Sequence, residues 1–307
     1  MSGLIAIVGA TGIGKSTLAL KIADSLNGEI INADSRQVYR YMNIGTAKPS
    51  TNDFSKVRHH LFDVADPDDP FNLAIYLGKA RKTVEEIRAK RKLPILVGGS
   101  GLYVWGLIDG LVIPAVPPDL HFRADLEMDV KHHGYKALYQ RLEEVDSVAA
   151  MTIDPRNVRR VIRALEVFEK TGMPFSSQLG KNPIDYPVFI IGLSAPRVLL
   201  YQRIDDRVEK MMDMGFLNEV EDLLGRGYSL DLPSMLSVGY KQIGMYLRGE
   251  CSVADAVELT KTGSHRLARH QGAWFKSIDP RITWFDITKD CDGLLIKRAE
   301  EFILSYT

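Results

Sequence analysis

The sequence predicts an α/β protein in which a parallel sheet is flanked by helices. Short apolar runs bounded by turn residues alternate with longer amphipathic stretches, and this alternation is typical of strand–helix–strand units. Between residues 111 and 186 the alternation gives way to segments rich in Arg, Glu and His, so a helical insertion is expected there. The expected strands lie near residues 3–8, 28–33, 93–98, 188–193 and 282–286.

The first strand runs directly into a glycine-rich segment, residues 9–16, that has the full G-x-x-x-x-G-K-[ST] pattern of a phosphate-binding P-loop. Its glycines let backbone N–H groups point at phosphate oxygens, and the next helix, expected from about Ser16 to Leu26, directs its positive end at the same anion. Lys15 adds a mobile positive charge, and the Ser16 hydroxyl is expected to hold Mg²⁺ together with the phosphates. A strand before the motif and a helix after it argue against an accidental turn, so the sheet is expected to be P-loop NTPase-like.

The second strand places Asp34 at its carboxyl end, which is the edge where open α/β sheets bind ligands. We interpret Asp34 as a general base. An Asp that follows a strand is equally suited to cap a helix, and the residues alone leave both roles open.

The third strand ends in Gly98, Gly99 and Ser100. A P-loop enzyme that hydrolyses ATP or transfers its γ-phosphate usually carries an Asp at such a strand end, where it holds Mg²⁺. Its absence here disfavours a kinase, although another strand could supply the carboxylate. The glycines predict that a backbone segment or a flat ligand approaches closely.

Proline-bearing turns at residues 112–118 and 181–187 mark the ends of the insertion. The expected organisation is a catalytic core of residues 1–113 and 187–307, with a helical insertion domain at 114–186. After the insertion the sheet resumes, and residues 291–306 are predicted to form one closing helix.

The composition indicates a globular protein with no overall charge. Lys and Arg together number 39, as do Asp and Glu, so any basic surface must be local. The two cysteines, Cys251 and Cys291, form neither a disulfide framework nor a zinc site, which is typical of a reducing compartment. No charged-then-apolar leader and no run of about 18 apolar residues is present. We therefore expect a cytoplasmic protein with no membrane partner.

Several further motifs follow the P-loop in a fixed order. They are Asp34-Ser35, Tyr39, Ile44 to Pro49, His59 to Leu61, Asp63, Gly98-Gly99, Leu102-Tyr103 and Val238 to Gln242. Together they strongly resemble the tRNA dimethylallyltransferases of the bacterial type, also called tRNA delta(2)-isopentenylpyrophosphate transferases. The resemblance extends from the P-loop to about Trp274 and is weakest in the insertion outside Arg156 to Val167. Ala10 and Ile13 depart from the family's usual P-loop, but a backbone anion site needs neither side chain.

The resemblance implies that a dimethylallyl group passes from dimethylallyl diphosphate to the exocyclic amine of the adenosine 3′-adjacent to the anticodon, with release of diphosphate. It also implies that Asp34 deprotonates that amine, that Arg207 neutralises the leaving diphosphate and that Thr11 is a third catalytic residue. Without the resemblance, Arg207 could equally form a surface ion pair with a neighbouring carboxylate. The residues that would bind the diphosphate are Gly9, Ala10, Thr11, Gly12, Ile13, Gly14, Lys15 and Ser16.

The resemblance further implies that the target base is extruded from the anticodon loop into the enzyme. The candidate tRNA contacts are Asp34, Ser35, Arg36, Gln37, Ser100, Arg123, Arg159, Arg160 and Arg163, with Arg156 beside them. Arg159 and Arg163 share a helix face, so a solvated surface explains these arginines as well. The helix from Ser264 to Gln271 is a second basic stripe to which both explanations apply. Mg²⁺ is the expected cofactor, and a monomer is expected.

Two other functions compete with prenyl transfer. Arg203 and Arg207 also resemble the arginine-bearing lid helix of a P-loop nucleotide kinase, and use of ATP would distinguish that activity. A non-catalytic RNA-binding module with a vestigial nucleotide site is the second alternative. Intact Lys15, Ser16 and Asp34 argue against it.

Overall fold

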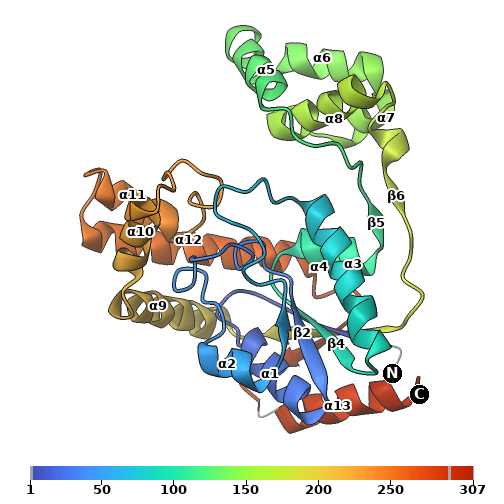
Figure 1. The fold of residues 1–307 in the computed structure, drawn as a ribbon, viewed down its shortest axis with the longest axis vertical. Coiled ribbons are helices and arrows are strands. Elements are labelled where there is room, and N and C mark those ends of the chain that lie inside the picture. Colours follow the sequence, from blue (N-terminus) through green and yellow to red (C-terminus); the bar gives the residue numbers. More distant parts are fainter. Residues whose placement is uncertain (1–2, 290–291, 307) are drawn as a thin grey trace. The chain divides into compact units, whose positions relative to one another are not determined.

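The computed structural model describes residues 3–289 and 292–306. It forms two compact units: the larger contains the described residues up to Ile108 and from Ile184 onward, and the smaller spans Asp109–Pro183 (Figure 1). Cys291, the first residue of the predicted closing helix, lies outside the described residues, and the helix α13 is described from Asp292 to Leu304. Within the described residues, no helix has the length and apolar character needed to span a bilayer.

The larger unit is built on a six-stranded sheet with strand order β3-β2-β4-β1-β7-β8, and every pairing in it is parallel. The five strands expected from the sequence are confirmed. The sixth strand, β3, has only two residues, too few to show an apolar run. The strands are β1 (Leu4–Val8), β2 (Gly28–Asn32), β3 (His59–His60), β4 (Leu93–Val97), β7 (Val188–Ser194) and β8 (Ile282–Asp286).

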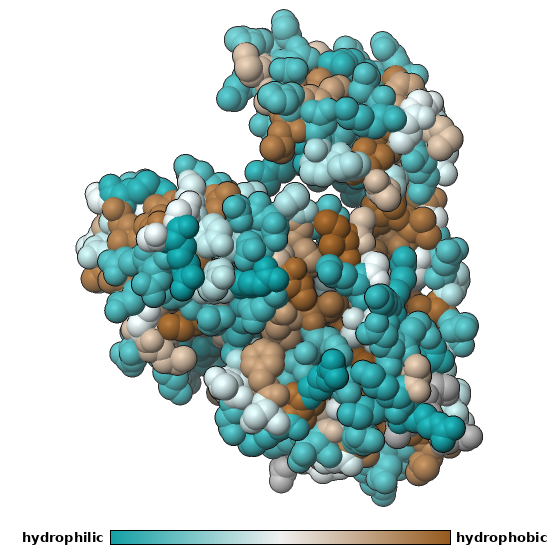
Figure 2. Space-filling view, viewed as in Figure 1, coloured by the Kyte–Doolittle hydropathy of each residue, from teal (hydrophilic) through white to brown (hydrophobic). Residues whose placement is uncertain are grey.

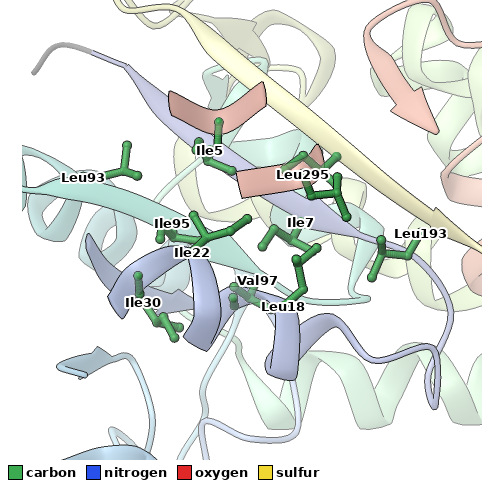
Figure 3. Close-up of a cluster of buried hydrophobic side chains, with 14 of the residues drawn as sticks. Ile5, Ile7, Leu18, Ile22, Ile30, Leu93, Ile95, Val97, Leu193 and Leu295 are labelled. Atoms are coloured by element: carbon green, nitrogen blue, oxygen red, sulfur yellow. The ribbon is translucent and has the colours of Figure 1, made fainter. Parts of the chain in front are cut away.

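The sheet is buried between helices on both faces, which explains why its central strands are apolar throughout rather than alternating. On one face, α1 (Lys15–Ser25) and α13 contribute Leu18, Ile22 and Leu295 to a cluster with Ile5 and Ile7 of β1 (Figure 3). The helices α3 (Leu73–Ala89) and α4 (Gly101–Ile108) cover the other face. This packing fixes the carboxyl edge of the sheet. At this edge the P-loop follows β1, the Asp34 segment follows β2 and the glycine turn follows β4.

Four helices and a long loop form a second buried cluster beside that edge. Residues 38–47 pack their apolar side chains against α9, α10 and α11, with Tyr240 and Phe216 in edge-to-face contact at 5.0 Å between ring centroids. The remaining helices of this unit are α2 (Thr51–Lys56), α9 (Arg197–Asp213), α10 (Phe216–Gly225), α11 (Tyr240–Leu247) and α12 (Val253–Trp274).

The smaller unit is helical and has its own apolar core, in which Leu126, Leu138 and Leu142 are buried. Its two connecting segments pair as short antiparallel strands, β5 (Leu111–Val112) and β6 (Gly180–Lys181). Because that pairing ties the connections together, the compact unit runs from Asp109 to Pro183, whereas the sequence placed the limits at 114 and 186. Its helices are α5 (Leu120–His133), α6 (Tyr135–Val145), α7 (Ser147–Thr152), α8 (Val158–Thr171) and the 3-10 helix η1 (Ser176–Gln178).

Candidate active site

The P-loop has the backbone conformation of an anion-binding site. Gly9, Gly12 and Gly14 have φ angles of 144°, 78° and 101°, in a region that L side chains rarely adopt. Gly14 is the N-terminal cap of α1, and no described side chain caps that helix start. The first N–H groups of α1 therefore remain available to an anion.

The structure brings the predicted catalytic residues Thr11 and Arg207 together with Lys15. Arg207, on α9, donates a hydrogen bond to the Thr11 hydroxyl at 3.3 Å. The Lys15 ammonium donates to the carbonyl oxygen of Ala10 at 2.8 Å. The Thr11 N–H donates to Oε1 of Gln271, on α12, at 2.7 Å. These contacts link the P-loop to two helices that lie about 200 or more residues away in sequence.

The charges at this site influence one another. Burial lowers the pKa of Lys15 to about 8; Asp34 opposes this shift and Arg207 adds to it. Burial also lowers the pKa of Arg207, again against the effect of Asp34. Two half-buried cations therefore face the Asp34 carboxylate, and a bound anion would restore the balance and favour the charged form of Lys15.

Asp34 is not a helix cap. No helix begins between residues 33 and 50, and α2 begins at Thr51. The Asp34 N–H instead donates to Oδ1 of Asn32 at 2.8 Å, and its own Oδ1 accepts from the Arg36 N–H at 2.8 Å. These turn hydrogen bonds hold the Asp34 carboxylate at the sheet edge, so the structure excludes one of the two roles that the sequence left open.

The glycines after β4 make room for neighbouring parts of the protein. A Cβ atom on Gly98 would lie 2.1 Å from the Ala33 carbonyl oxygen, and one on Gly99 would lie 2.2 Å from Nε2 of Gln271. The predicted close approach of backbone is thus confirmed, and α12 supplies the second neighbour. Ser100 also joins the turn to the Asp34 segment, because its hydroxyl accepts the Ser35 N–H at 2.9 Å.

Two hollows of the larger unit meet at this site, with volumes of about 470 Å³ and about 790 Å³. We call the smaller one the acceptor hollow; its apolar walls include Ile204, Leu267 and Trp274. We call the larger one the donor hollow; it is lined by the P-loop residues Lys15 and Ser16, among others. Figure 2 shows that hydrophobic residues gather toward the middle of the larger unit in this view. The residues that line both hollows are Thr11, Asp34, Thr46, Arg207, Met211 and Gln271.

The loop that carries the motif from Ile44 to Pro49 is held by the carboxylate of Glu219, a residue that the sequence analysis did not identify. The Glu219 side chain accepts the N–H groups of Asn43, Ile44 and Gly45 and the hydroxyl of Tyr240, all within 3.1 Å. This network places the loop at the wall of both hollows. No local pattern marks Glu219, because its partners in the loop lie about 175 residues earlier.

The tRNA candidates in the larger unit lie at the hollows. Ser35, Arg36 and Ser100 line the acceptor hollow, and Gln37 lines the donor hollow. Arg36 donates to the Pro233 carbonyl at 3.0 Å, and the Gln37 amide donates to the carbonyl oxygens of residues 46 and 47. Arg36 and Gln37 therefore also support the loops around the site.

The four arginines of the smaller unit that are predicted to contact tRNA fall into two groups. Arg123 and Arg163 both pair with the fully buried Glu166, at 2.7 Å and 2.6 Å, so they hold the unit's own helices together. Burial would raise the pKa of Glu166, but hydrogen bonds from these arginines and from the Asp119 N–H lower it. For Arg163, the alternative explanation of a solvated helix face is therefore excluded.

Arg159 and Arg160 form the second group. Both are exposed, and within the described part of the chain their side chains make no ion pair. Arg156 is exposed as well but pairs with Asp154 at 2.8 Å. Only the second group leaves its full positive charge available to a partner.

The donor hollow also fits the expected metal. Ser16 is exposed there beside Lys15, and its hydroxyl is the kind of hard oxygen that Mg²⁺ prefers. The described residues contain no group of three or more His, Cys, Asp or Glu side chains placed to hold an ion. A Mg²⁺ ion at this site would therefore rely on diphosphate oxygens for most of its ligands, as Mg²⁺ commonly does.

Comparisons with known proteins identify the family of the chain. The IPP transferase family model matches residues 37–278, and the isopentenyl transferase model matches residues 2–69. A tRNA dimethylallyltransferase of Roseiflexus castenholzii is 46% identical over 99% of this chain and 98% of the relative. One from Dehalococcoides mccartyi is 42% identical over 99% of this chain and 93% of the relative.

Solved structures show the same similarity. A tRNA isopentenylpyrophosphate transferase from Bacillus halodurans is 38% identical and superimposes with a TM-score of 0.71 over 99% of this chain and 96% of that one. A eukaryotic dimethylallyltransferase, described as acting on tRNA, is 26% identical with a TM-score of 0.84 over 100% of this chain and 81% of that one. The P-loop sheet, the Asp34 edge and these matches together show that the chain belongs to the IPP transferase family, the tRNA dimethylallyltransferases.

Proposed function

We propose that this chain transfers a dimethylallyl group from dimethylallyl diphosphate to the exocyclic amine of the tRNA adenosine 3′-adjacent to the anticodon. The observation that carries the proposal is the meeting of the donor and acceptor hollows at Thr11, Asp34 and Arg207. One hollow offers an anion site and the other an apolar space beside a carboxylate. Two substrates can thus reach the same carboxylate from different sides.

The donor hollow supplies charge stabilisation for the leaving group. As the allylic carbon–oxygen bond breaks, its electron pair goes to the diphosphate, whose negative charge grows. Lys15, Arg207 and the N–H groups at the start of α1 are already held in place, so they bind the transition state more strongly than the ground state. Mg²⁺, held by Ser16 and the diphosphate oxygens, would add further charge neutralisation.

The acceptor hollow supplies the base. The amine nitrogen forms a new bond to the allylic carbon, and its proton passes to the Asp34 carboxylate. An aromatic amine is a weak nucleophile, so loss of its proton must accompany the attack. The turn hydrogen bonds of Asp34 keep that carboxylate at the sheet edge, where both hollows reach it.

The exposed arginines of the smaller unit suit an RNA partner. We propose that Arg159 and Arg160 contact phosphates of the anticodon arm, whereas Arg123 and Arg163 support the helices that carry them. We also propose that the chain acts as a monomer. A tRNA substrate also supports a cytoplasmic location.

Mass spectrometry of tRNA adenosines tests this function. The chain is incubated with dimethylallyl diphosphate, Mg²⁺ and unmodified tRNA, and prenylated adenosine next to the anticodon is expected, with no consumption of ATP. The Asp34→Asn variant serves as the control, because it retains the side-chain shape but is a far weaker base. Robust ATP turnover without tRNA, and no prenylated adenosine, would favour the kinase alternative instead.

A further inference from the structure

Gln271 lies where the two hollows meet. It comes from α12, it is 6% exposed, and it is one of the residues that line both hollows. The sequence shows it only as the last residue of a basic stripe, and the proposed reaction assigns it no role. A buried amide with this position needs partners for both of its ends.

The orientation of the Gln271 amide follows from its contact with the P-loop. The Thr11 N–H is a donor, so the atom that meets it at 2.7 Å must be the oxygen, Oε1. The NH₂ group therefore points the other way, toward Gly99, where a Cβ atom would lie only 2.2 Å from Nε2. Gly99 lines the acceptor hollow, and within the described residues no acceptor binds this NH₂ group, so its donors are available to a ligand there.

The turn that Gln271 contacts is also in contact with the Asp34 segment. The Ser100 N–H donates to the Ala33 carbonyl at 3.2 Å, and a Cβ atom on Gly98 would lie 2.1 Å from the same oxygen. An acceptor, the Asp34 carboxylate, and a donor, the Gln271 amide, thus flank one short turn. Both also line the acceptor hollow.

This pairing of groups complements one edge of adenine. The exocyclic amine of adenine donates hydrogen bonds, and the ring nitrogens on either side of it, N1 and N7, accept them. Guanine carries a carbonyl oxygen in place of that amine. This oxygen would face the Asp34 carboxylate with no proton between the two acceptors. An acceptor and a donor that line the same hollow therefore favour adenine over guanine.

We propose that Gln271 reads the target base: its NH₂ group donates a hydrogen bond to the adenine ring nitrogen next to the reacting amine, while its Oε1 holds the Thr11 N–H. This inference rests on the proposed function, because it places the adenine amine at Asp34. One side chain then fixes the base and the P-loop relative to each other. Gln271 is thus a specificity-determining and positioning residue for the transfer.

Base analogues test the proposal. Anticodon stem-loop RNAs carry adenosine, 7-deazaadenosine or 1-deazaadenosine at the target position, and kcat/KM for prenylation is measured with each. For the wild-type protein, kcat/KM should be about 10- to 100-fold lower with one of the two analogues than with adenosine, because a buried donor is left without its acceptor. The analogue that is affected identifies the ring nitrogen.

The Gln271→Met variant should no longer distinguish that analogue from adenosine, because it keeps a similar volume but has no donor. Effects on donor binding through Thr11 cancel, since the comparison is made within one variant. Thr262→Ala, an exposed position on the same helix, should retain the wild-type discrimination. If Gln271→Met does not fold, Gln271→Glu serves the same comparison, because its carboxylate still accepts the Thr11 N–H.

The outcomes separate this inference from the proposed function. Equal wild-type rates on adenosine and both analogues would overturn the role of Gln271 and leave prenyl transfer intact. A loss on one analogue that persists unchanged in Gln271→Met would also overturn it. Failure of the wild-type protein to prenylate the adenosine RNA would instead refute the proposed function.

Discussion

At the scale of single residues, the chemistry rests on a small set of side chains whose surroundings the fold determines. Asp34 follows a buried strand and is held by backbone hydrogen bonds, while Lys15 and Arg207 are cations in a largely desolvated place. The sequence pattern predicted Lys15 and placed Asp34 at the sheet edge, whereas Arg207 and the role of Asp34 as a base came from the family resemblance. Glu219 and Gln271 escaped prediction because their hydrogen-bond partners lie about 175 and 260 residues away.

The role of Asp34 as a base predicts a defect in the chemical step. Asp34→Ala should lower the single-turnover rate by about 10²- to 10⁴-fold, the usual contribution of a general base, with a much smaller effect on tRNA affinity. Asp24→Ala, an exposed position on α1, is the matched control and should retain the wild-type rate. A near-normal rate in Asp34→Ala would show that another group takes the proton.

The lowered pKa of Lys15 predicts how donor binding depends on pH. In the free protein this pKa is about 8, and a bound diphosphate raises it, so the anion prefers the protonated form. Affinity for dimethylallyl diphosphate should therefore be constant well below pH 8 and fall by up to about tenfold per pH unit above it. Calorimetric titration across this range measures the effect. Lys15→Arg stays charged, and its affinity should show no such step; a step of equal size in that variant would assign the titration to another group.

At the scale of elements, the five main strands were predictable because each is a continuous apolar run between turn residues. Three others, β3, β5 and β6, have two residues each and carry no such signal. The pairing of β5 with β6 also moves the limits of the insertion, and a pairing between residues about 70 apart cannot be seen in either segment alone.

The helices of the smaller unit depend on the Glu166 cluster. Arg163→Ala should reduce the free energy of unfolding by about 2 kcal/mol, because buried Glu166 loses one charged hydrogen bond but keeps Arg123. Urea unfolding of the whole chain, followed by a signal from this unit, measures the change. Arg160→Ala is the matched control, since its side chain is exposed, and it should leave the unfolding midpoint unchanged. Equal midpoints for both variants would mean that the cluster contributes no net stability.

At the scale of the whole molecule, Lys and Arg are equal in number to Asp and Glu, yet the proposed substrate is a polyanion. Long-range attraction by net charge is therefore absent, and RNA binding must come from local arrangements of cations. The structure divides the basic residues of the smaller unit by their partners, which the sequence could not do. Arg123 and Arg163 both pair with Glu166, whereas Arg159 and Arg160 are exposed and no described acidic side chain pairs with them.

This division predicts the salt dependence of tRNA binding. Each phosphate contact that is lost should reduce the slope of log K, where K is the association constant for tRNA, against log salt by just under one. The Arg159→Ala/Arg160→Ala double variant should therefore bind tRNA more weakly, with a slope shallower by between about one and two. Affinity for dimethylallyl diphosphate should not change, because the P-loop belongs to the other unit. Lys136→Ala/Lys131→Ala removes the same charge from α5 and α6 and is the control for a purely general charge effect. If both double variants reduce the slope equally, the smaller unit attracts tRNA by its general positive charge and not by contacts of Arg159 and Arg160. If neither variant changes the slope, the larger unit alone holds the anticodon arm, and the arginines at the start of α8 are a solvated surface.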